Sequence, residues 1–418
     1  MAIEILGTNY VNKGAELMAR AIVAQLAARY PGVPVAQDFR VGSARQRRAA
    51  GLMHLATTTS QRAALLGTVA GAAASLLTAS TRRRFHLVLP SEVRLVLDAS
   101  GFAYSDQWGP RWAGAVARRL ELAKARGARV VLLPQAFGPF TDPALIAPMR
   151  RIMDAADLVF ARDSRSRDLL ATLGRSMARV RLAPDFTTLV KVDAAGPAPD
   201  AAGGALIVPN YRMVDKGGDK GEAYLRFLEA CVRAVVAETG MLPGVLVHDD
   251  RDDRKVAESL IQRTGHALRI LHIPDPERAK AVIGASALVI GSRYHALVAA
   301  LSQGVPTIGA GWTHKYRQLF TDYAVADCML DVAAPPEQVE AVVASLCHAA
   351  PARRVRSVLR VTAERERRRA AEMWTQVWEL ADPLFPGHVE ATQEVATWRP
   401  SPELRASLSW EARPGVAE

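Results

Sequence analysis

A short segment in the second half of the sequence combines residues that could bind an anion. Arg293 and His295 lie in Gly291-Ser-Arg-Tyr-His-Ala296, where an apolar, strand-like run gives way to a helical pattern. A helix that follows a strand in this way points free backbone N–H groups and its positive dipole end at the preceding turn. With a guanidinium and an imidazole added, this turn suits a phosphate or a carboxylate. We predict an anion site there; a structural ion pair for Arg293 and a capping role for His295 are the alternatives.

A second cationic cluster follows the next strand-like run. In Gly309-Ala-Gly-Trp-Thr-His-Lys-Tyr316, His314 and Lys315 come a few positions after the apolar run at 307–308. Parallel strands carry their following loops to the same edge of a sheet, which is where open α/β folds bind ligands. We therefore predict that His314 and Lys315 add positive charge to the anion site; surface positions are the alternative.

The first half of the chain has polar side chains after several strand-like runs. Arg162 and Asp163 follow the run at 158–161. Arg162 could reach the anion across a cleft, and Asp163 could be a general base or the cap of the following helix. The other candidates, which could bind or deprotonate a hydroxyl group, are Asn9, Asn12, Asp98, Ser100, Asp106 and Gln135.

Asp185 and the loop at 248–250 are interpreted as structural. Asp185, beside Pro184, occupies the position of a turn residue. His248, Asp249 and Asp250 end a strand-like run and have the composition of a metal site, but their spacing on one loop is poor and no other ligand cluster is evident. We therefore predict a solvated loop near the cleft, and neither a metal nor a cofactor.

Short apolar runs alternate with helix-length segments along most of the chain. The runs, most of them bounded by Gly, Pro or Asp, lie at 3–6, 95–97, 130–133, 158–161, 206–208, 245–247, 268–271, 288–290 and 307–308. This alternation predicts parallel sheets covered by helices on both faces. The predicted fold class is α/β, with two doubly wound, Rossmann-like domains that face each other across a cleft.

A stretch rich in proline, glycine and alanine, DAAGPAPDAAGG, marks the boundary between the two alternating series. We predict an N-terminal domain at 1–193 with an insertion at about 45–84, a linker at 194–204, a C-terminal domain at 205–350, an amphipathic helix at 351–385 and a tail at 386–418. The helix is predicted from apolar residues that recur on one face between Val355 and Leu380.

Composition indicates a globular protein with anionic partners. Hydrophobic residues make up 50% and charged residues 23% of the 418 residues, which excludes a disordered or fibrous chain. The net charge of +11 favours phosphorylated small molecules, nucleic acid or an acidic membrane face. The positive charge is spread along the chain and no nucleic-acid reader motif stands out, so we predict no nucleic acid. Three cysteines without CxxC spacing, and no leader pattern, favour the cytoplasm.

The uncharged segment 63–80 lies between Arg62 and the run Arg82-Arg83-Arg84. It is near the minimum length that spans a bilayer, but Ala, Gly, Ser and Thr dominate it, so its transfer into lipid is weak. We interpret it as a buried or interfacial helix whose arginines could rest on anionic headgroups, at the inner face of the membrane. A helical insertion with solvated basic ends is the alternative.

Several motifs, taken together, resemble those of the polysaccharide pyruvyl transferase family. The segment 291–296, the turn Gly304-Val-Pro306 and the cluster Trp312…His314-Lys315-Tyr316 look like the C-terminal signature of that family. Four earlier segments also resemble motifs of that family. Gly7…Asn9…Asn12-Lys-Gly14-Ala15-Glu16 resembles its glycine/asparagine turn, and LPQAFGPF at 133–140 resembles its PQ-x-x-GP segment. FARDSRS at 160–166 resembles its ARD-x-x-S segment, and Ala183-Pro-Asp185 resembles its A-P-D stretch. The motifs occur in the expected order over roughly residues 3–320.

The resemblance implies a GT-B-like fold and a ketal-forming transferase of exopolysaccharide biosynthesis for the cell envelope. It implies phosphoenolpyruvate as co-substrate, no cofactor, and a sugar, lipid-linked oligosaccharide or polysaccharide as acceptor. Because this donor carries a phosphate and a carboxylate on three carbons, it needs several cations in a small space. The implied donor-binding residues are Ser292, Arg293, His295, Lys315, His314 and Arg162, with His295 as the acid that protonates the enol carbon, Arg293 as the anion fork and Asp163 as the third catalytic candidate.

The sequence leaves the acceptor open. The chain has Asp98-Ala-Ser-Gly-Phe102 where the family often has a glycine-rich turn, and 45–84 looks divergent. Both departures fall in the half that would meet the acceptor. Two other functions stay open. One is a GT-B glycosyltransferase that uses a nucleotide sugar, although no clear acidic motif follows Gly309. The other is a non-catalytic phosphate- or sugar-binding protein.

Overall fold

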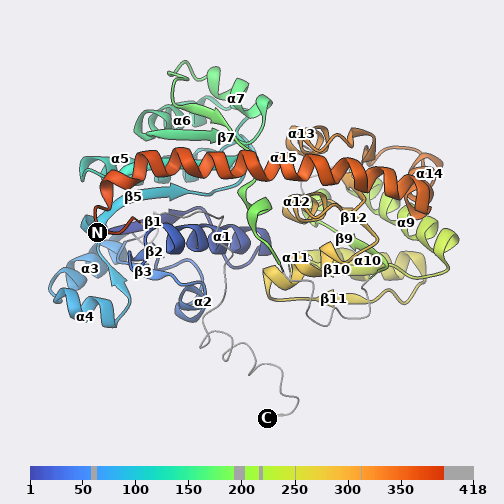
Figure 1. Cartoon of the computed structure of the whole chain (residues 1–418), viewed down its shortest axis with the longest axis horizontal. Coiled ribbons are helices and arrows are strands. Elements are labelled where there is room, and N and C mark those ends of the chain that lie inside the picture. The colour runs from blue at the N-terminus through green and yellow to red at the C-terminus, as the bar shows by residue number, and fades with distance from the viewer. Residues whose placement is uncertain (58–63, 193–202, 216–219, 250, 312, 390–418) are drawn as a thin grey trace, which may run out of the picture.

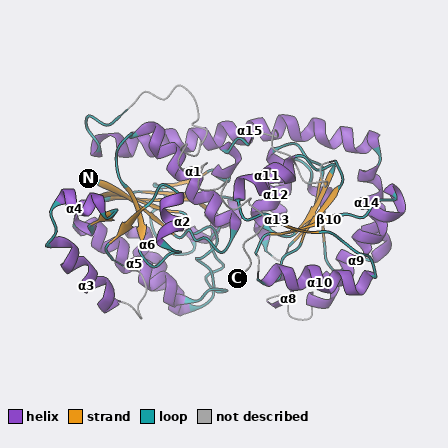
Figure 2. Ribbon diagram, turned by 90° about the horizontal axis from the view of Figure 1, so that it is seen from below, coloured by secondary structure: helices purple, strands orange, loops and turns teal. Residues whose placement is uncertain are grey.

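Two parallel β-sheets form the centres of two α/β domains (Figure 1). The computed structural model describes residues 1–57, 64–192, 203–215, 220–249, 251–311 and 313–389. The strand order is β4-β3-β2-β1-β5-β6-β7-β8 in the first sheet and β11-β10-β9-β12-β13-β14 in the second, and the paired strands are parallel. Helices cover both faces of each sheet (Figure 2). The predicted α/β class with two doubly wound domains is confirmed.

The N-terminal domain contains the first eight strands. Its strands are β1 (Ala2–Leu6), β2 (Val35–Asp38), β3 (Met53–Leu55), β4 (Leu87–Val88), β5 (Val93–Asp98), β6 (Arg129–Gln135), β7 (Leu158–Ala161) and β8 (Val180–Leu182). Its helices are α1 (Lys13–Arg29), α2 (Ala44–Ala49), α3 (Ala64–Ser75), α4 (Ala79–Arg84), α5 (Pro110–Ala125), α6 (Pro143–Ala155) and α7 (Ser164–Ala171), with 3₁₀ turns η2 (Pro90–Glu92) and η3 (Phe186–Leu189). The segment predicted as an insertion at 45–84 therefore contributes β3 to the sheet as well as helices.

The C-terminal domain contains the remaining six strands. Its strands are β9 (Ala205–Val208), β10 (Gly244–Val247), β11 (Ile270–His272), β12 (Leu288–Gly291), β13 (Thr307–Ala310) and β14 (Met329–Leu330). Its helices are α8 (Arg212–Asp215), α9 (Lys220–Thr239), α10 (Asp252–Thr264), α11 (Pro276–Gly284), α12 (Tyr294–Ser302), α13 (His314–Asp322) and α14 (Pro336–Cys347), with the 3₁₀ turn η4 (Ala326–Cys328). Most of the predicted linker (residues 194–202) and most of the predicted tail (residues 390–418) lie outside the described residues.

The order of the strands reverses once in each sheet, and these reversals place the functional loops. In the first sheet the reversal lies between β1 and β5, and in the second between β9 and β12. Loops that follow the two strands at such a switch point diverge and leave a crevice at the carboxyl edge of the sheet. The sheets therefore predict a ligand site between the loops after β1, β5, β9 and β12.

A single long helix, α15 (Ala349–Ala381), connects the two domains a second time (Figures 1 and 2). Its 33 residues extend over about 50 Å at 1.5 Å per residue. Leu359 and Ala363 belong to the hydrophobic core of the C-terminal domain, whereas Met373 and Trp374 belong to a core of the N-terminal domain. The 3₁₀ turn η5 (Asp382–Leu384) then ends the described helical structure. Each domain thus packs on a different half of the same helix, and this contact limits how the domains can move.

Most of the strands consist largely of buried apolar residues, and β1 shows how one charge is accommodated among them. All five residues of β1 are buried, including Glu4. Arg119 of α5, itself 5% exposed, donates to both carboxylate oxygens of Glu4, with a distance of 2.9 Å from Nε to Oε1. A buried carboxylate is tolerated when a cation and hydrogen bonds compensate it.

The substitution Arg119→Met should destabilise the protein strongly, because it leaves the Glu4 carboxylate buried without its cation. We expect a loss of about 3–5 kcal/mol in the free energy of unfolding, measured by urea denaturation at pH 7. The double variant Glu4→Gln/Arg119→Met removes both charges and should recover most of that loss. Equal stability of the single and double variants would contradict this account of the pair.

Candidate active site

A cavity of about 700 Å³ lies between the two domains, at the switch points of both sheets. The loops after β1, β5, β9 and β12 all contribute to its wall, and the loop after β13 leads into α13, which does so too. Seven residues predicted to form the site line it, namely Asn9, Asn12, Ser100, Arg162, Arg293, His295 and Lys315. The cavity therefore brings together motifs that lie almost three hundred residues apart in the sequence.

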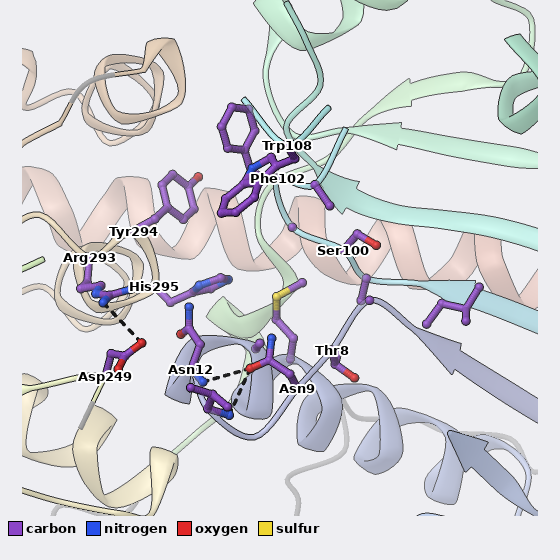
Figure 3. Close-up of a pocket in the computed structure, with 18 of the residues that line it drawn as sticks. Thr8, Asn9, Asn12, Ser100, Phe102, Trp108, Asp249, Arg293, Tyr294 and His295 are labelled. Carbon is purple, nitrogen blue, oxygen red and sulfur yellow. Dashed lines mark hydrogen bonds and ion pairs between the residues drawn. The ribbon is translucent and has the colours of Figure 1, made fainter. Parts of the chain in front are cut away.

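Arg293 lines the cavity but already has a carboxylate partner. Its Nε and Nη2 donate to the two oxygens of Asp253 in the first turn of α10, with Nε 2.8 Å from Oδ2. Its Nη2 also lies 3.8 Å from Asp249 (Figure 3). Asp253 is completely buried. The predicted structural ion pair is thus present, and the Nε–Nη2 edge of the guanidinium is committed to it.

His295 lies at the contact between the domains. Its imidazole packs against Gly14 in the first turn of α1, so closely that a Cβ on Gly14 would come within 2.3 Å of Nδ1. Its Nε2 lies 3.5 Å from the carboxylate of Asp185 and makes no hydrogen bond to any described residue. Burial lowers the pKa of His295 from 6.5 to about 4. The imidazole is therefore neutral at pH 7 in the ligand-free protein, whereas the predicted acid role requires a proton.

Lys315 has an aromatic environment in place of a carboxylate. Its Nζ lies 4.2 Å from the ring centroid of Phe102, 5.3 Å from that of Tyr316 and 5.4 Å from that of Tyr294. No ion pair or hydrogen bond links its ammonium to another described residue. Burial lowers the pKa of Lys315 well below its usual value, and the charge of Arg162 lowers it further. An anion that enters the cavity would raise the pKa of Lys315 again and so stabilise its protonated form, which no described carboxylate contacts.

Arg162 reaches the cavity from the N-terminal domain. Its Nη1 donates to Asp185 Oδ2 at 3.0 Å, and its guanidinium lies 3.9 Å from the ring centroid of Tyr294 in the other domain. Burial alone would raise the pKa of Asp185, but His295 and Arg162 together lower it below its ordinary value. Asp185 therefore stays ionised between an arginine and the imidazole of His295. Sequence reasoning assigned it only a turn role, and it does cap η3 by accepting from Thr187 N.

The loop after β1 supplies short polar groups to the opposite wall. Asn9 Oδ1 accepts hydrogen bonds from the backbone of Val11 and Asn12, and Asn12 Oδ1 accepts from Gly14 N as the cap of α1 (Figure 3). In the neighbouring loop after β5, Ser100 donates to Asp98 Oδ1 at 2.6 Å. These contacts fix the two loops, and the side chains of Asn9, Asn12 and Ser100 still line the cavity.

Asp163 and His314 lie outside the cavity wall and contact each other instead. Asp163 caps α7 by accepting from Ser166 N at 2.6 Å, which is the capping alternative of the sequence analysis. His314 Nε2 lies 3.5 Å from Asp163 Oδ1 and 3.2 Å from Ser166 Oγ. Burial alone would raise the pKa of Asp163, yet His314 and the hydrogen bonds hold it below its usual value. This pair joins the two domains, and neither residue is among those that line the cavity.

Four other predicted site residues are also not among those that line the cavity. Asp98 is fully buried and accepts from Ser100 and Tyr104, and burial raises its pKa. Asp106 accepts from the backbone of Thr141 and Asp142 and so holds two loops together. Gln135 and Ser292 are fully buried. The binding roles predicted for Asp98, Asp106, Gln135 and Ser292 are therefore not supported by their positions.

Sequence reasoning missed several residues that the structure places in the cavity. Tyr294 carries contacts to both Arg162 and Lys315. The loop at 248–250 was predicted near the cleft, but its described residues His248 and Asp249 are buried rather than solvated, and they line the wall beside Arg293. Asp250 lies outside the described residues. The aromatic residues Phe102, Trp108 and Trp112 line the N-terminal wall. Their signal in the sequence was an unusual gathering of aromatic residues directly after the strand that ends at Asp98.

No group of three or more His, Cys, Asp or Glu side chains within the described ranges is arranged to hold a metal ion. In the same ranges, no helix combines the length and the apolar character needed to span a bilayer.

Comparison with solved structures defines the class of fold. The chain is similar to UDP-GlcNAc 2-epimerase from Neisseria meningitidis bound to UDP-GlcNAc, with a TM-score of 0.55 at 10% identity over 91% of this chain and 100% of that one. It is also similar to S. aureus MnaA with UDP (TM-score 0.54, 12% identity, 94% and 99% covered) and to the glycotransferase of kitacinnamycin (0.50, 14%, 92% and 99%). The chain thus has the GT-B-like fold of glycosyltransferases and sugar-nucleotide epimerases.

A family model defines the protein more closely. The model for polysaccharide pyruvyl transferase matches residues 12–314, which is well over half of the chain. The chain belongs to the polysaccharide pyruvyl transferase family and is a transferase. The resemblance drawn from the motifs is confirmed, and the non-catalytic alternative is replaced. A comparison with curated proteins finds no match.

The buried, neutral state of His295 predicts a pH dependence of stability. Between pH 6.5 and about 4 the unfolded chain binds a proton at this imidazole that the folded protein does not bind, so the free energy of unfolding should fall as the pH drops through this window. His295→Gln should flatten this part of the profile in urea unfolding between pH 7 and pH 4. His388→Gln, at an exposed position, is the control. Superimposable profiles for wild type and His295→Gln would refute the assignment.

Proposed function

We propose that this transferase moves the pyruvyl group of phosphoenolpyruvate onto two hydroxyls of a sugar, forming a pyruvate ketal. The acceptor is a polysaccharide or its sugar or lipid-linked oligosaccharide precursor, and the product belongs to an exopolysaccharide of the cell envelope. The observation that carries the proposal is the position of Lys315, whose Nζ lies among three aromatic rings, without a described carboxylate partner, in a cavity that Arg162 and Arg293 also line.

The starts of two helices at the cavity, α12 and α13, support the choice of an anionic donor. Arg293 occupies the cap position of α12 without a side-chain hydrogen bond to the helix, and Thr313 likewise leaves the start of α13 without a side-chain cap. Helix N-termini in this condition favour phosphate and carboxylate groups. The Nη1 atom of Arg293 is not committed to Asp253. Phosphoenolpyruvate carries both a phosphate and a carboxylate, so it would use the two helix N-termini and the Nη1 atom of Arg293 at once.

The proposed reaction begins with protonation of the donor. Carbon 3 of phosphoenolpyruvate takes a proton from His295, and carbon 2, stabilised by its own oxygen, is attacked by the first hydroxyl of the sugar. His295 is neutral before the donor arrives, because burial lowers its pKa to about 4. The negative charges of the donor would raise that pKa, so that donor binding brings in the proton that the reaction uses. Asp185, 3.5 Å from Nε2, would hold the imidazolium in place.

The second step releases the phosphate. The second hydroxyl attacks carbon 2, and the bond between carbon 2 and the bridging oxygen breaks. Of the two protons that the hydroxyls lose, one replaces the proton that His295 gave to carbon 3 and the other leaves on the phosphate. Lys315 and Arg293 would neutralise the departing group. The balance requires no redox cofactor.

Lys315→Met keeps the length of the side chain and removes its charge. Because hydrogen bonds to charged groups contribute about 1.5–3 kcal/mol, the variant should lose roughly 10–100-fold in kcat/KM for phosphoenolpyruvate, measured by phosphate release with a sugar acceptor. The control is Lys191→Met, at an exposed position outside the cavity wall. Unchanged kinetics of Lys315→Met would remove the main support of the proposal.

A nucleotide sugar is the other donor to be tested, because GT-B-like neighbours were solved with UDP or UDP-GlcNAc bound. Thermal unfolding with phosphoenolpyruvate, UDP and UDP-GlcNAc in parallel separates the two possibilities. Stabilisation by phosphoenolpyruvate alone, lost in Lys315→Met, supports pyruvyl transfer. Stabilisation by UDP and UDP-GlcNAc alone favours glycosyl transfer.

We further infer that the protein acts at the cytoplasmic face of an anionic membrane, through the surface formed by α3 and α4. Leu76 and Phe85 are 87% and 59% exposed, and Arg83 and Arg84 are exposed between them. Exposed apolar side chains beside arginines suit the interface of an anionic bilayer. This contact would bring a lipid-linked acceptor to the enzyme.

Replacing Leu76 and Phe85 by Ser should reduce co-sedimentation with vesicles that contain phosphatidylglycerol, because the two apolar anchors are lost. High salt should reduce it as well, since it screens Arg83 and Arg84. Met241→Ser/Leu242→Ser removes an exposed apolar pair of the C-terminal domain and should have no effect. Equal sedimentation of both double variants would show that this surface does not contact lipid.

A further inference from the structure

Lys280 is a buried lysine that the proposed reaction does not use and that joins the two domains. It lies on α11 of the C-terminal domain, is 3% exposed and is not among the residues that line the cavity. Its Nζ donates to two backbone carbonyls of the N-terminal domain, Thr187 O in η3 and Val190 O just after it, each at 2.7 Å. Burial lowers the pKa of Lys280 to about 7, but the ammonium and the neutral amine both have the two N–H groups that these bonds need. Lys280 therefore holds η3 in either protonation state.

The 3₁₀ turn that Lys280 holds begins beside the carboxylate that faces His295. Thr187 donates to Asp185 Oδ1 from its backbone N, at 3.0 Å, and from its hydroxyl, at 2.6 Å. The other oxygen of Asp185, Oδ2, accepts from Arg162 at 3.0 Å and lies 3.5 Å from His295 Nε2. Thr187 thus offers its carbonyl to Lys280 and both of its donors to Asp185. A shift of Thr187 would move the carboxylate relative to the imidazole.

Lys280 and His295 lie on neighbouring helices of the same domain. The helices α11 and α12 pack side by side where the domains meet (Figures 1 and 2). Gln303, at the end of α12, donates from Nε2 to the backbone O of Lys280 at 2.9 Å. The contacts therefore form a closed loop. It runs from His295 along α12 to Gln303 and Lys280, crosses to Thr187 and Asp185 of the other domain, and returns to His295.

The spacing between Asp185 and His295 is not set by a bond between these two side chains. At 3.5 Å, Oδ2 and Nε2 are too far apart for a good hydrogen bond. Arg162 belongs to the same domain as Asp185, so it orients the carboxylate without fixing it against the other domain. The two bonds of Lys280 do cross the boundary. Because a carboxylate a few ångströms from an imidazole favours its protonated form, this spacing affects how readily His295 takes up a proton.

We propose that Lys280 is a positioning residue for the proton transfer: by holding η3 from the C-terminal domain, it keeps the Asp185 carboxylate beside His295. This inference rests on the proposed function, since it takes His295 to be the acid. Lys280 contacts neither the substrates nor the reacting atoms, and it acts through Thr187 and Asp185.

The pH dependence of kcat for Lys280→Met tests this role, with phosphoenolpyruvate and a sugar acceptor. We expect kcat to fall about 10–100-fold, because small displacements of catalytic groups are costly. KM for phosphoenolpyruvate should stay within about twofold, because the cations that bind the donor are unchanged. Activity is lost at high pH when the acid loses its proton, and this loss should move to lower pH by about one unit, since Asp185 supports the proton less well. If Lys280 acted through its positive charge alone, its removal would move the loss to higher pH instead. The charged groups that face Lys280, namely Asp185, Glu277 of α11 and Arg367 of α15, are unchanged in this variant.

Three further variants separate positioning from general weakening of the domain contact. Lys280→Arg keeps N–H donors and should recover part of kcat. Thr187→Val removes one donor to Asp185 and should shift the pH profile in the same direction as Lys280→Met. The double variant Lys280→Met/Thr187→Val should lose less than the product of the two single losses, because both changes act on the same carboxylate. Arg20→Gln is the matched control, since Arg20 is also buried and pairs with Asp275 at the start of α11, across the same boundary, at 2.7 Å. It should lower the thermal stability and leave the pH profile in place.

Nuclear magnetic resonance of the full chain, labelled with ¹⁵N and ¹³C at histidine, tests the positioning without any substrate. The ring signal of His295 is identified by its loss in His295→Gln. In Lys280→Met it should move toward its position in Asp185→Asn, which lacks the carboxylate, and in Arg20→Gln it should stay at the wild-type position. Thr187→Val provides the same test if Lys280→Met is too unstable to purify.

An unmoved His295 signal in Lys280→Met would overturn the proposal, and so would a pH profile that stays in place or moves to higher pH. Equal changes in Arg20→Gln would also overturn it, because they would show only a loosened domain contact. If the resonance results are as expected but the wild type does not turn over phosphoenolpyruvate, the positioning role stands and pyruvyl transfer fails. If phosphoenolpyruvate is turned over and Lys280→Met changes neither the signal nor the profile, pyruvyl transfer stands and the positioning role fails.

Discussion

Compensation of buried positive charge is the constraint on which the whole cavity depends. Arg162 and Arg293 are each held against a buried carboxylate, Asp185 and Asp253 respectively. Lys315 is held by aromatic rings, which attract a cation by about 0.5–2 kcal/mol and leave its charge available. The two arginines are therefore already neutralised within the protein, whereas no described carboxylate contacts Lys315, so a bound anion would stabilise its protonated form. In the reaction we propose, the same anion would raise the low pKa of His295 and bring in the proton.

Much of the fold, and the place of the site, could be predicted from local patterns. Strands buried on both faces appear in the sequence as apolar runs, and their alternation with helices is enough to predict parallel sheets. Parallel sheets in turn fix which loops meet, so the turns at Arg293 and Lys315 could be assigned to one rim without knowledge of the structure. The resemblance of the motifs to one family agreed with that placement, and the family match over residues 12–314 confirmed it.

The orientation of individual side chains could not be predicted in the same way. A strand that is apolar on both faces has no alternation to show which residues point toward the cavity, so Arg162 and its neighbour Asp163 looked equally suitable, as did Asp98 and Ser100. In each pair one residue lines the cavity and the other is buried behind it. The ion pair between Arg293 and Asp253 could not be predicted either, because Asp253 lies on a helix forty residues earlier in the sequence. No rule of sequence spacing identifies Phe102, Trp108 and Trp112 as residues that line a cavity.

The path of α15 has a consequence for how the protein is made. The last turns of this helix place Trp374, and the chain just after it places Phe385, in the apolar interior of the domain that is synthesised first. On the ribosome, that domain has an uncovered apolar face until α15 has emerged as well. Nascent chains that stop before this point would expose the face and attract chaperones. The N-terminal domain therefore completes this apolar core only after α15 and the residues up to Phe385 have been translated.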